Sequence, residues 1–289
     1  MNENNGIIRN ASVLGVPKML LLGLQHMFAM FGATILVPIL VNSYFGEDVL
    51  HVQVTLICAG VGTLLFHFCS KGKVPAFLGS SFAFLGGFAT ISKLNTGAFA
   101  NISNAEKLSY ACGGILVAGL LYLVLALIIR LIGVKKVMRF LPPVVTGPII
   151  IAIGLGLAPS AVNNCKNNWW LAVVALVLVI VFNIFGKGMI KIIPILLGII
   201  GAYLTAVVVG NIGGVESFAI DFTGVKEAAW IGFPIEWSST VFGGVHDSGK
   251  AISAIIALVP ISIATMMEHI GDISAISATC KKNYIQDPG

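Results

Sequence analysis

Three ionisable side chains, Glu268, His269 and Asp272, lie inside the apolar stretch ISIATMMEHIGDISAIS near the end of the chain. In a membrane span, each carboxylate would cost about 2.5–3.5 kcal/mol to insert, and ionisable groups at this depth usually carry function. An ionised carboxylate accepts hydrogen bonds from N–H groups, whereas a protonated one can give up its proton. Glu268 and Asp272 are four residues apart and share one helical face, which must look into protein or a water-filled cavity.

Two other interpretations of this cluster are weaker. The helix could end near Met267 and leave the charges at the interface, but the apolar pattern continues to Lys281 and Lys282, a basic end typical of a span. An intramembrane metalloprotease would need zinc ligands on one helical face, as in H-E-x-x-H. Here glutamate precedes histidine and position 273 is isoleucine. Neither a metal site nor an enzyme is therefore expected.

The composition predicts an integral membrane protein. Of 289 residues, 57% are hydrophobic and 10% charged, with a mean hydropathy of +0.97, whereas soluble domains carry about 25% charged residues. The net charge of +5 does not indicate nucleic acid as a partner, because the basic residues are spread between apolar runs. The five cysteines include no C-x-x-C pair, so no disulfide framework is expected. The N-terminus shows no cleavable signal peptide.

Eight apolar segments approach the roughly 20 residues that cross a bilayer. They are predicted at Met19–Val41, Val52–Cys69, Val74–Ile91, Tyr110–Ile129, Leu141–Ala158, Trp169–Phe185, Ile192–Gly210 and Ile252–Ala278. The end of the segment Leu141–Ala158 is the least sharply defined, because its apolar run fades through Pro159. Residues 211–250 are predicted to form an extramembrane loop, with Trp230 and Trp237 at the level of the lipid headgroups.

The basic residues also predict the orientation. With eight spans, twelve of the 17 Lys and Arg residues fall on one side and five on the other, which is the acidic side. Positively charged loops stay in the cytoplasm. We therefore expect a multi-pass protein of a bacterial plasma membrane with a cytoplasmic N-terminus.

The segment KGKVPAFLGSSFAFLGGFATISK does not read as an ordinary spanning helix. Pro75 removes a backbone donor, and its glycines loosen the backbone. We predict an extended half, Val74–Leu78, followed by a short helix capped by Ser80 or Ser81. The first turn of such a half-helix leaves N–H groups free to meet a polar substrate near the midplane of a transporter. The alternative is a glycine-rich helix that packs closely against its neighbours.

The first and eighth segments share a short sequence motif. Gln25 and His26 in GLQHMFAMFGATILVP correspond to Glu268 and His269, since each pair places a carboxamide or carboxylate before a histidine in an apolar helix. Duplicated halves are typical of secondary transporters, and this spacing fits a repeat of seven segments. His26 could equally be a packing residue bonded to a neighbouring carbonyl.

Three motifs in order, LQHMFAMFGATILVP, KGKVPAFLGSSFAFLGG and EHIGDISA followed by KKNYIQDPG, closely resemble the uracil permeases of the nucleobase–ascorbate (nucleobase–cation symporter-2) family. The resemblance covers essentially the whole chain. It implies an all-α polytopic membrane protein with fourteen segments in two inverted repeats of seven. It also implies a core domain that carries the substrate and moves against a gate domain, in proton-coupled uptake of a base.

The resemblance also implies residue roles. Glu268 matches a glutamate that accepts hydrogen bonds from ring N–H groups, and Phe82 matches a residue whose backbone amide meets the base. Ala33 matches a backbone contact of the first segment, His26 matches a histidine that shapes the site, and Ser81 joins them as the half-helix cap. Asp272, or Glu268 itself, is the candidate for proton coupling. No cofactor is implied beyond the proton.

Asp272 departs from the best-known uracil pattern, in which a histidine stands at this position. Other family members, purine carriers among them, have aspartate there, so xanthine or urate remains a possible substrate beside uracil. An anion carrier of the related sulfate-transporter fold is a further alternative, which the negative charge of Glu268 disfavours. A channel is conceivable, although the sequence shows no ring of like charges.

The expected organisation follows from the spans and the resemblance. It comprises a cytoplasmic N-terminus (1–16), a first seven-segment repeat (17–210), an extracytoplasmic loop (211–250) and the first segment of a second repeat (251–289). Six further segments of the family pattern are missing, so we expect a truncated chain that does not transport alone. The expected partners are the nucleobase, the lipid bilayer and, as a possible homodimer, a second copy.

Overall fold

A computed structural model describes residues 11–140, 143–228 and 240–286, and every regular element in these ranges is helical. The longer helices are α1 (Val16–Phe45), α2 (Val52–Cys69), α3 (Leu85–Ser92), α4 (Asn104–Ile132), α6 (Pro143–Cys165), α7 (Trp169–Phe185), α9 (Pro194–Ala206), α12 (Ser248–Leu258) and α13 (Ile261–Cys280). The shorter ones are η1 (Ala11–Leu14), η2 (Phe82–Phe84), η3 (Gly97–Phe99), α5 (Val134–Phe140), α8 (Met189–Ile192), the π-helical turn η4 (Val207–Ile212), η5 (Glu216–Phe218), α10 (Thr223–Glu227) and α11 (Val241–Gly244). The prediction of an all-α polytopic membrane protein is confirmed.

The apolar helices of the described ranges coincide with the predicted segments, although their ends differ. Five are long and apolar enough to cross a membrane by length and composition: Val16–Phe45, Val52–Cys69, Asn104–Ile132, Gly147–Cys165 and Pro194–Ile212. Two shorter apolar helices, Phe82–Ser92 and Trp169–Phe185, occupy the third and sixth predicted positions. The eighth position is filled by α12 and α13 together, a pair bent by 43°. The inverted repeat remains a prediction.

The third segment has the predicted form. Its first part is extended, and helix begins only at η2, which leads directly into α3. The Leu78 N–H donates to Thr63 Oγ1 on α2 (3.1 Å), and the Ser80 hydroxyl donates to the Thr34 carbonyl (3.1 Å). The first bond gives the Leu78 N–H a partner, as backbone at membrane depth requires. The second attaches the extended segment to α1.

Three predicted boundaries were wrong. The helix that was expected to fade at Pro159 continues as α6 to Cys165. The fourth segment begins at Asn104 instead of Tyr110, so Lys107, which was assigned to a loop, lies within α4 and is only 3% exposed. The eighth segment is not one helix, since α12 ends at Leu258 and α13 begins after Pro260, a residue that has no N–H to donate.

The described parts of the predicted loop 211–250 contain the short elements η5, α10 and α11, together with the end of η4 at Ile212 and the start of α12 at Ser248. The predicted loop is therefore shorter at both ends than expected. Within it, the Asp221 carboxylate accepts from the Thr223 hydroxyl and the Thr223 backbone N–H. Trp230 and Trp237, which were predicted at the headgroup level, lie outside the described residues.

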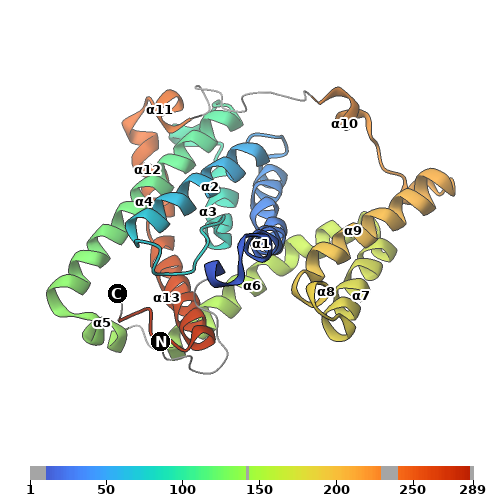
Figure 1. Ribbon diagram of the computed structural model, residues 1–289. Helices are drawn as coiled ribbons and strands as arrows, with labels where there is room; N and C mark the ends of the chain where they lie inside the picture. The colour runs from blue at the N-terminus through green and yellow to red at the C-terminus, as the bar shows by residue number, and fades with distance from the viewer. Residues whose placement is uncertain (1–10, 141–142, 229–239, 287–289) are drawn as a thin grey trace. The chain divides into compact units, whose positions relative to one another are not determined.

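The chain divides into two compact units. Unit 1 comprises Met1–Ala33 and Leu157–Phe233, and unit 2 comprises Thr34–Gly156 and Pro234–Gly289. In unit 1, α7 and α9 form a helical hairpin (Figure 1). A Cβ on Gly198 of α9 would lie 2.3 Å from Val179 Cγ2, so glycine is what permits this close approach.

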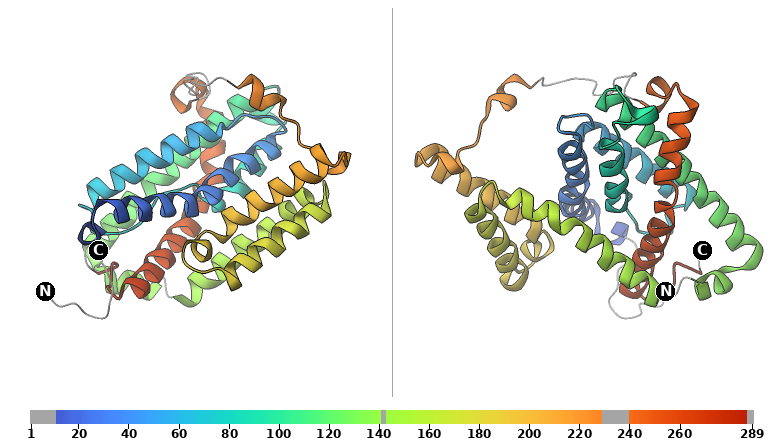
Figure 2. Two further views of the ribbon diagram at one scale, coloured as in Figure 1. Left: turned by 45° about the vertical axis from the view of Figure 1, so that its right-hand side comes forward. Right: turned by 180° about the vertical axis from the view of Figure 1, so that it is seen from behind.

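Unit 2 is built on α4, against which α3, α12 and α13 pack (Figure 2). Leu258, the last residue of α12, is fully buried between two glycines. A Cβ on Gly87 of α3 would lie 2.2 Å from Leu258 Cδ2, and one on Gly114 of α4 would lie 2.7 Å from Leu258 Cδ1. The bend between α12 and α13 is therefore held where three helices meet.

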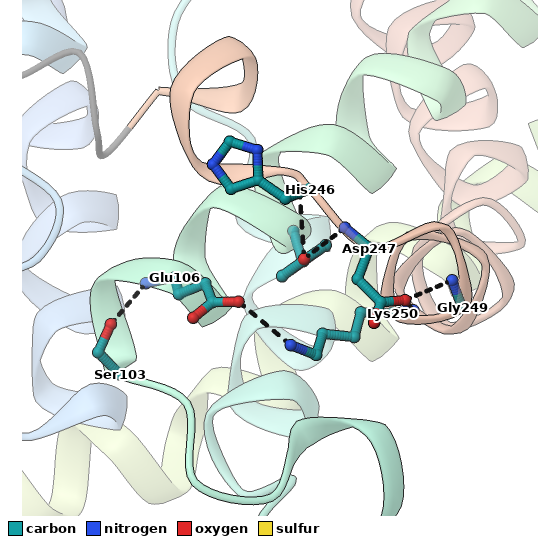
Figure 3. Close-up of polar contacts among 7 residues, drawn as sticks. Ser103, Glu106, His246, Asp247, Gly249 and Lys250 are labelled. Atoms are coloured by element: carbon teal, nitrogen blue, oxygen red, sulfur yellow. Dashed lines mark hydrogen bonds and ion pairs between the residues drawn. The ribbon is translucent and has the colours of Figure 1, made fainter.

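Polar contacts fix the start of α12 to the first turns of α4 (Figure 3). Lys250 Nζ lies 3.3 Å from Glu106 Oε1, and the Tyr110 hydroxyl accepts from the Asp247 N–H (3.0 Å). Asp247 caps α12 by accepting from the N–H groups of Gly249 and Lys250. These backbone bonds, that of Lys250 foremost, lower the pKa of the Asp247 carboxyl from its ordinary 3.8.

Candidate functional site

The first part of the candidate site is the start of the half-helix in the third segment. Ser81 has extended backbone angles (φ −91°, ψ 126°), and its hydroxyl accepts from the Ala83 N–H at 3.3 Å. Serine is a favourable N-cap because its short side chain reaches the free donors of the first turn. The Phe82 N–H is the first donor of this turn, where a helix supplies no carbonyl partner.

The far end of the half-helix is stabilised by a buried cation. Lys107 Nζ donates to Asn95 Oδ1 (2.6 Å) and to the Ser92 carbonyl (3.4 Å), which lies in the last turn of α3. A positive charge at a helix C-terminus complements the helix dipole. This contact fixes α3 against α4, and with it the position of η2.

The second part of the site is α13, which packs against η2 within unit 2. Glu268 on α13 is half-buried, and its Oε2 atom is shielded from solvent with no hydrogen-bond partner among the described residues. A buried carboxylate oxygen without a donor is costly, so it marks a place that a ligand or a proton can fill. Asp272, four residues further along α13, is exposed.

A chain of hydrogen bonds joins α13 to α4 beside Glu268. The Tyr122 hydroxyl donates to Thr265 Oγ1 (2.9 Å), and the Thr265 hydroxyl donates to the Ser262 carbonyl (2.9 Å). His269 Nδ1 lies 2.9 Å from the same Tyr122 oxygen. The donor of this third contact depends on the tautomer of the His269 ring. The chain thus fixes the rotation of α13 about its axis, and hence the direction of Glu268.

The structure places the predicted site residues in both units. Ser81, Phe82, Glu268 and Asp272 belong to unit 2, in which η2 and α13 are in contact. His26 and Ala33 lie on the part of α1 that belongs to unit 1, and both are exposed there. The functional roles of all six remain predictions.

Sequence reasoning missed three residues that build the site. Lys107 was hidden because its helix begins earlier than hydropathy indicates. Tyr122 and Thr265 are single polar residues in apolar surroundings, and they are 143 positions apart. A tyrosine or threonine inside a span needs a hydrogen-bond partner, which is a usable signal, but the sequence does not name the partner. Within the described ranges, no group of three or more His, Cys, Asp or Glu side chains could hold a metal ion.

Comparisons with known proteins show what the chain is similar to in sequence. The model of the Permease family matches residues 17–289. The chain is 38% identical to the uracil permease of Bacillus caldolyticus over 284 residues, 95% of this chain and 59% of that protein. It is 35% identical over 285 residues to the putative pyrimidine permease RutG of Escherichia coli (strain K12), covering 98% and 60% of the two chains. It is 35% identical over 279 residues to the uracil permease of Bacillus subtilis (strain 168), covering 92% and 58%. The chain therefore spans about 60% of the length of these relatives.

Proposed function

The chain belongs to the Permease family, and from that premise we propose that it supplies the base-binding half of a proton-coupled uracil permease. Glu268 carries this proposal, because its Oε2 is shielded from solvent and has no hydrogen-bond partner among the described residues. Glu268 belongs to α13, the helix that packs against η2. Two of the three relatives described above are uracil permeases, which supports uracil as the substrate. Because the chain spans about 60% of those relatives, transport is proposed for a protein that also contains the remaining segments.

The chemistry of the base matches the groups of unit 2. A uracil-like edge presents N–H donors beside carbonyl acceptors in one plane. The two oxygens of an ionised Glu268 accept from ring N–H groups in charge-assisted hydrogen bonds, which are about twice as strong as neutral ones. The Phe82 N–H donates to a carbonyl oxygen of the base. Ser81 holds the first turn in shape. For Ala33 and His26, which lie on α1, the resemblance to the family supports a role in binding the base.

The proposed coupling ion is a proton, with Asp272 as its carrier and Glu268 as the base-binding group. The exposure of Asp272 within the described chain supports this division of roles, since Glu268 Oε2 is shielded from solvent. Asp272→Asn should leave uracil binding intact and abolish accumulation driven by a proton gradient. Unchanged accumulation by this variant would remove Asp272 from the mechanism.

The orientation proposed for the protein places its N-terminus in the cytoplasm, and a homodimer is its proposed oligomer. Twelve of the 17 basic residues fall on one side of the spans, which supports this orientation. Cysteine labelling from outside intact cells tests it at Lys71→Cys, which should stay unlabelled, and Lys93→Cys, which should react. Labelling at Lys71→Cys and not at Lys93→Cys would show the opposite orientation, with the N-terminus outside.

Uptake of labelled uracil tests the substrate and the coupling together. Cells that express a protein containing this chain and the remaining family segments should accumulate uracil only with an inward proton gradient, and excess unlabelled uracil should compete. Stronger competition by xanthine would assign a purine substrate, and competition by sulfate would favour the anion carrier. Cells that express residues 1–289 alone are expected to show no uptake, and clear uptake by them would overturn that expectation.

A further inference from the structure

Unit 2 contains a recess of about 380 Å³ that is separate from the candidate base site. It lies between the short helix α5 and the segment that follows α13. Its lining residues are Val134, Lys135, Arg139, Asn283, Ile285 and Gln286.

One wall of the recess is the basic face of α5. Lys135 and Arg139 are four residues apart, so both side chains project from the same side of the helix. Lysine offers a compact point charge, and arginine offers a planar fork of N–H donors that matches phosphate oxygens. None of the lining residues is acidic. The recess therefore presents two positive charges to a ligand without an internal counter-ion among its lining residues.

The opposite wall is folded back by its own hydrogen bonds. α13 ends at Lys281, which adopts a left-handed conformation (φ 49°), and the Tyr284 N–H then donates to Ser277 Oγ (3.0 Å). The N–H groups of Ile285 and Gln286 donate to Asn283 Oδ1 (3.1 and 3.2 Å). Since the Asn283 oxygen is used within the wall, its NH₂ group is the one available to donate to a ligand.

The level of the recess in the bilayer follows from the two spans that its walls adjoin. α4 ends at Ile132, and only Gly133 (φ 86°) separates it from α5. The other wall begins directly after α13, the second half of the bent span. Residues that follow a span immediately lie in the headgroup layer of a bilayer. The lining also combines apolar Val134 and Ile285 with four polar side chains, as expected where an acyl chain meets its headgroup.

From these features we propose that the recess binds the phosphate group of an anionic phospholipid. Lys135 and Arg139 bind the phosphate oxygens, the Asn283 and Gln286 amides donate to the headgroup, and Val134 and Ile285 contact the glycerol end of the acyl chains. Basic pockets beside spans are a known type of site for acidic headgroups. This site is independent of the proposed transport, because none of its residues belongs to the base site.

Lipid binding can be measured without any transport assay. Purified protein in detergent is titrated with phosphatidylglycerol or phosphatidylcholine, and bound lipid is counted by native mass spectrometry. The wild type should prefer phosphatidylglycerol by about tenfold, and Lys135→Gln/Arg139→Gln should lose this preference. The matched control is Lys71→Gln/Lys73→Gln, which removes two charges from the exposed turn after α2 and should keep the preference.

A charge-conserving variant and a soluble competitor test the lipid site further. Lys135→Arg keeps the charge and should retain binding, so its loss of the lipid would contradict a charge-based site even if the double variant unfolds. Glycerol 3-phosphate at equal concentration should not displace the lipid, because it lacks the acyl chains that contact Val134 and Ile285. Equal displacement would assign the recess to a soluble phosphate ester, and equal loss in the Lys71/Lys73 control would show only nonspecific attraction.

Discussion

The α7–α9 hairpin of unit 1 and the α3–α4–α12–α13 assembly of unit 2 pack their helices in a similar way but differ in their polar contacts. Both bring helices together through glycine, at Gly198 and Gly201 in the first and at Gly87 and Gly114 in the second. Small residues permit such approach where lipid gives no hydrophobic drive for helix association. Close packing alone therefore does not distinguish the two regions.

The difference lies in where polar side chains make contacts between segments. In unit 1, Asn168 and Asn211 bond across segments, and both stand at the ends of helices (Asn168 to the Ser217 carbonyl, Asn211 to the Ile220 backbone). In unit 2, Tyr122 bonds to Thr265 in the interior of two spans. Shape suffices to hold a hairpin, whereas a binding site also needs each helix fixed in rotation. The polar contact in the interior of unit 2 therefore serves to orient the side chains of its helices.

The largest expected effect is at Glu268. Glu268→Gln keeps the size of the side chain but replaces an acceptor with an NH₂ donor that opposes the N–H groups of the base. Binding of labelled uracil by protein containing the chain should weaken about 100-fold, because two charge-assisted hydrogen bonds are lost. Glu216→Gln in the exposed η5 of unit 1 is the matched control and should bind normally. Normal binding by Glu268→Gln would end the proposed role of this residue.

Glycine substitutions compare the two packing regions directly. An alanine Cβ at Gly114 would meet Leu258 Cδ1 at 2.7 Å and the Ala254 carbonyl oxygen at 2.9 Å, and one at Gly198 would meet Val179 Cγ2 at 2.3 Å. Both substitutions should destabilise the protein by about 1–3 kcal/mol in thermal or denaturant unfolding. Only Gly114→Ala should also weaken uracil binding, since it shifts α12 and the bend before α13.

Gly119→Ala is the control for this pair. Gly119 lies on the same helix as Gly114, but a Cβ there would meet nothing within 4 Å. It should leave stability unchanged or raise it by up to about 1 kcal/mol through helix propensity. Equal loss of uracil binding in Gly114→Ala and Gly198→Ala would contradict the separation of binding from scaffold.

Tyr122→Phe tests the rotation of α13 with a smaller change. It removes one hydroxyl and keeps the ring, so it should cost about 1 kcal/mol and raise the Kd for uracil about fivefold. A double-mutant cycle with Thr265→Val should show coupling, because the two side chains share a hydrogen bond. Tyr203→Phe on α9 of unit 1 is the control. Additive effects of Tyr122→Phe and Thr265→Val would mean that the bond does not orient the helix.

The smallest expected effect concerns acid stability at the start of α12. The pKa of Asp247 is lowered in the folded chain by backbone N–H bonds, so its stabilising contribution is present above the ordinary carboxyl pKa of 3.8 and is lost as the pH falls through the lower folded value. Asp247→Asn should therefore flatten the fall in unfolding temperature below about pH 4. The pKa of Asp221 in unit 1 is lowered chiefly by its bond from the Thr223 hydroxyl. Because Asp221 caps no span, Asp221→Asn should alter the curve less than Asp247→Asn.

Several features of the protein were determined by the sequence alone because their causes are local. Hydropathy places the apolar segments, since every span must be apolar over about 20 residues whatever its neighbours are. Pro75 and the Ser81 cap predict the extended half and the half-helix, because both act through their own backbone. The position of Glu268 within an apolar helix is likewise visible in the sequence.

Only the tertiary structure decided which proline breaks a helix. Pro38 and Pro159 lie inside continuous helices, whereas α12 ends just before Pro260. The difference is that Leu258 is locked between Gly87 and Gly114, which belong to helices remote in the sequence. The Tyr122–Thr265 bond and the burial of Lys107 have the same origin. A proline permits a bend and a hydroxyl needs a partner, but packing between distant segments selects which bend and which partner the chain adopts.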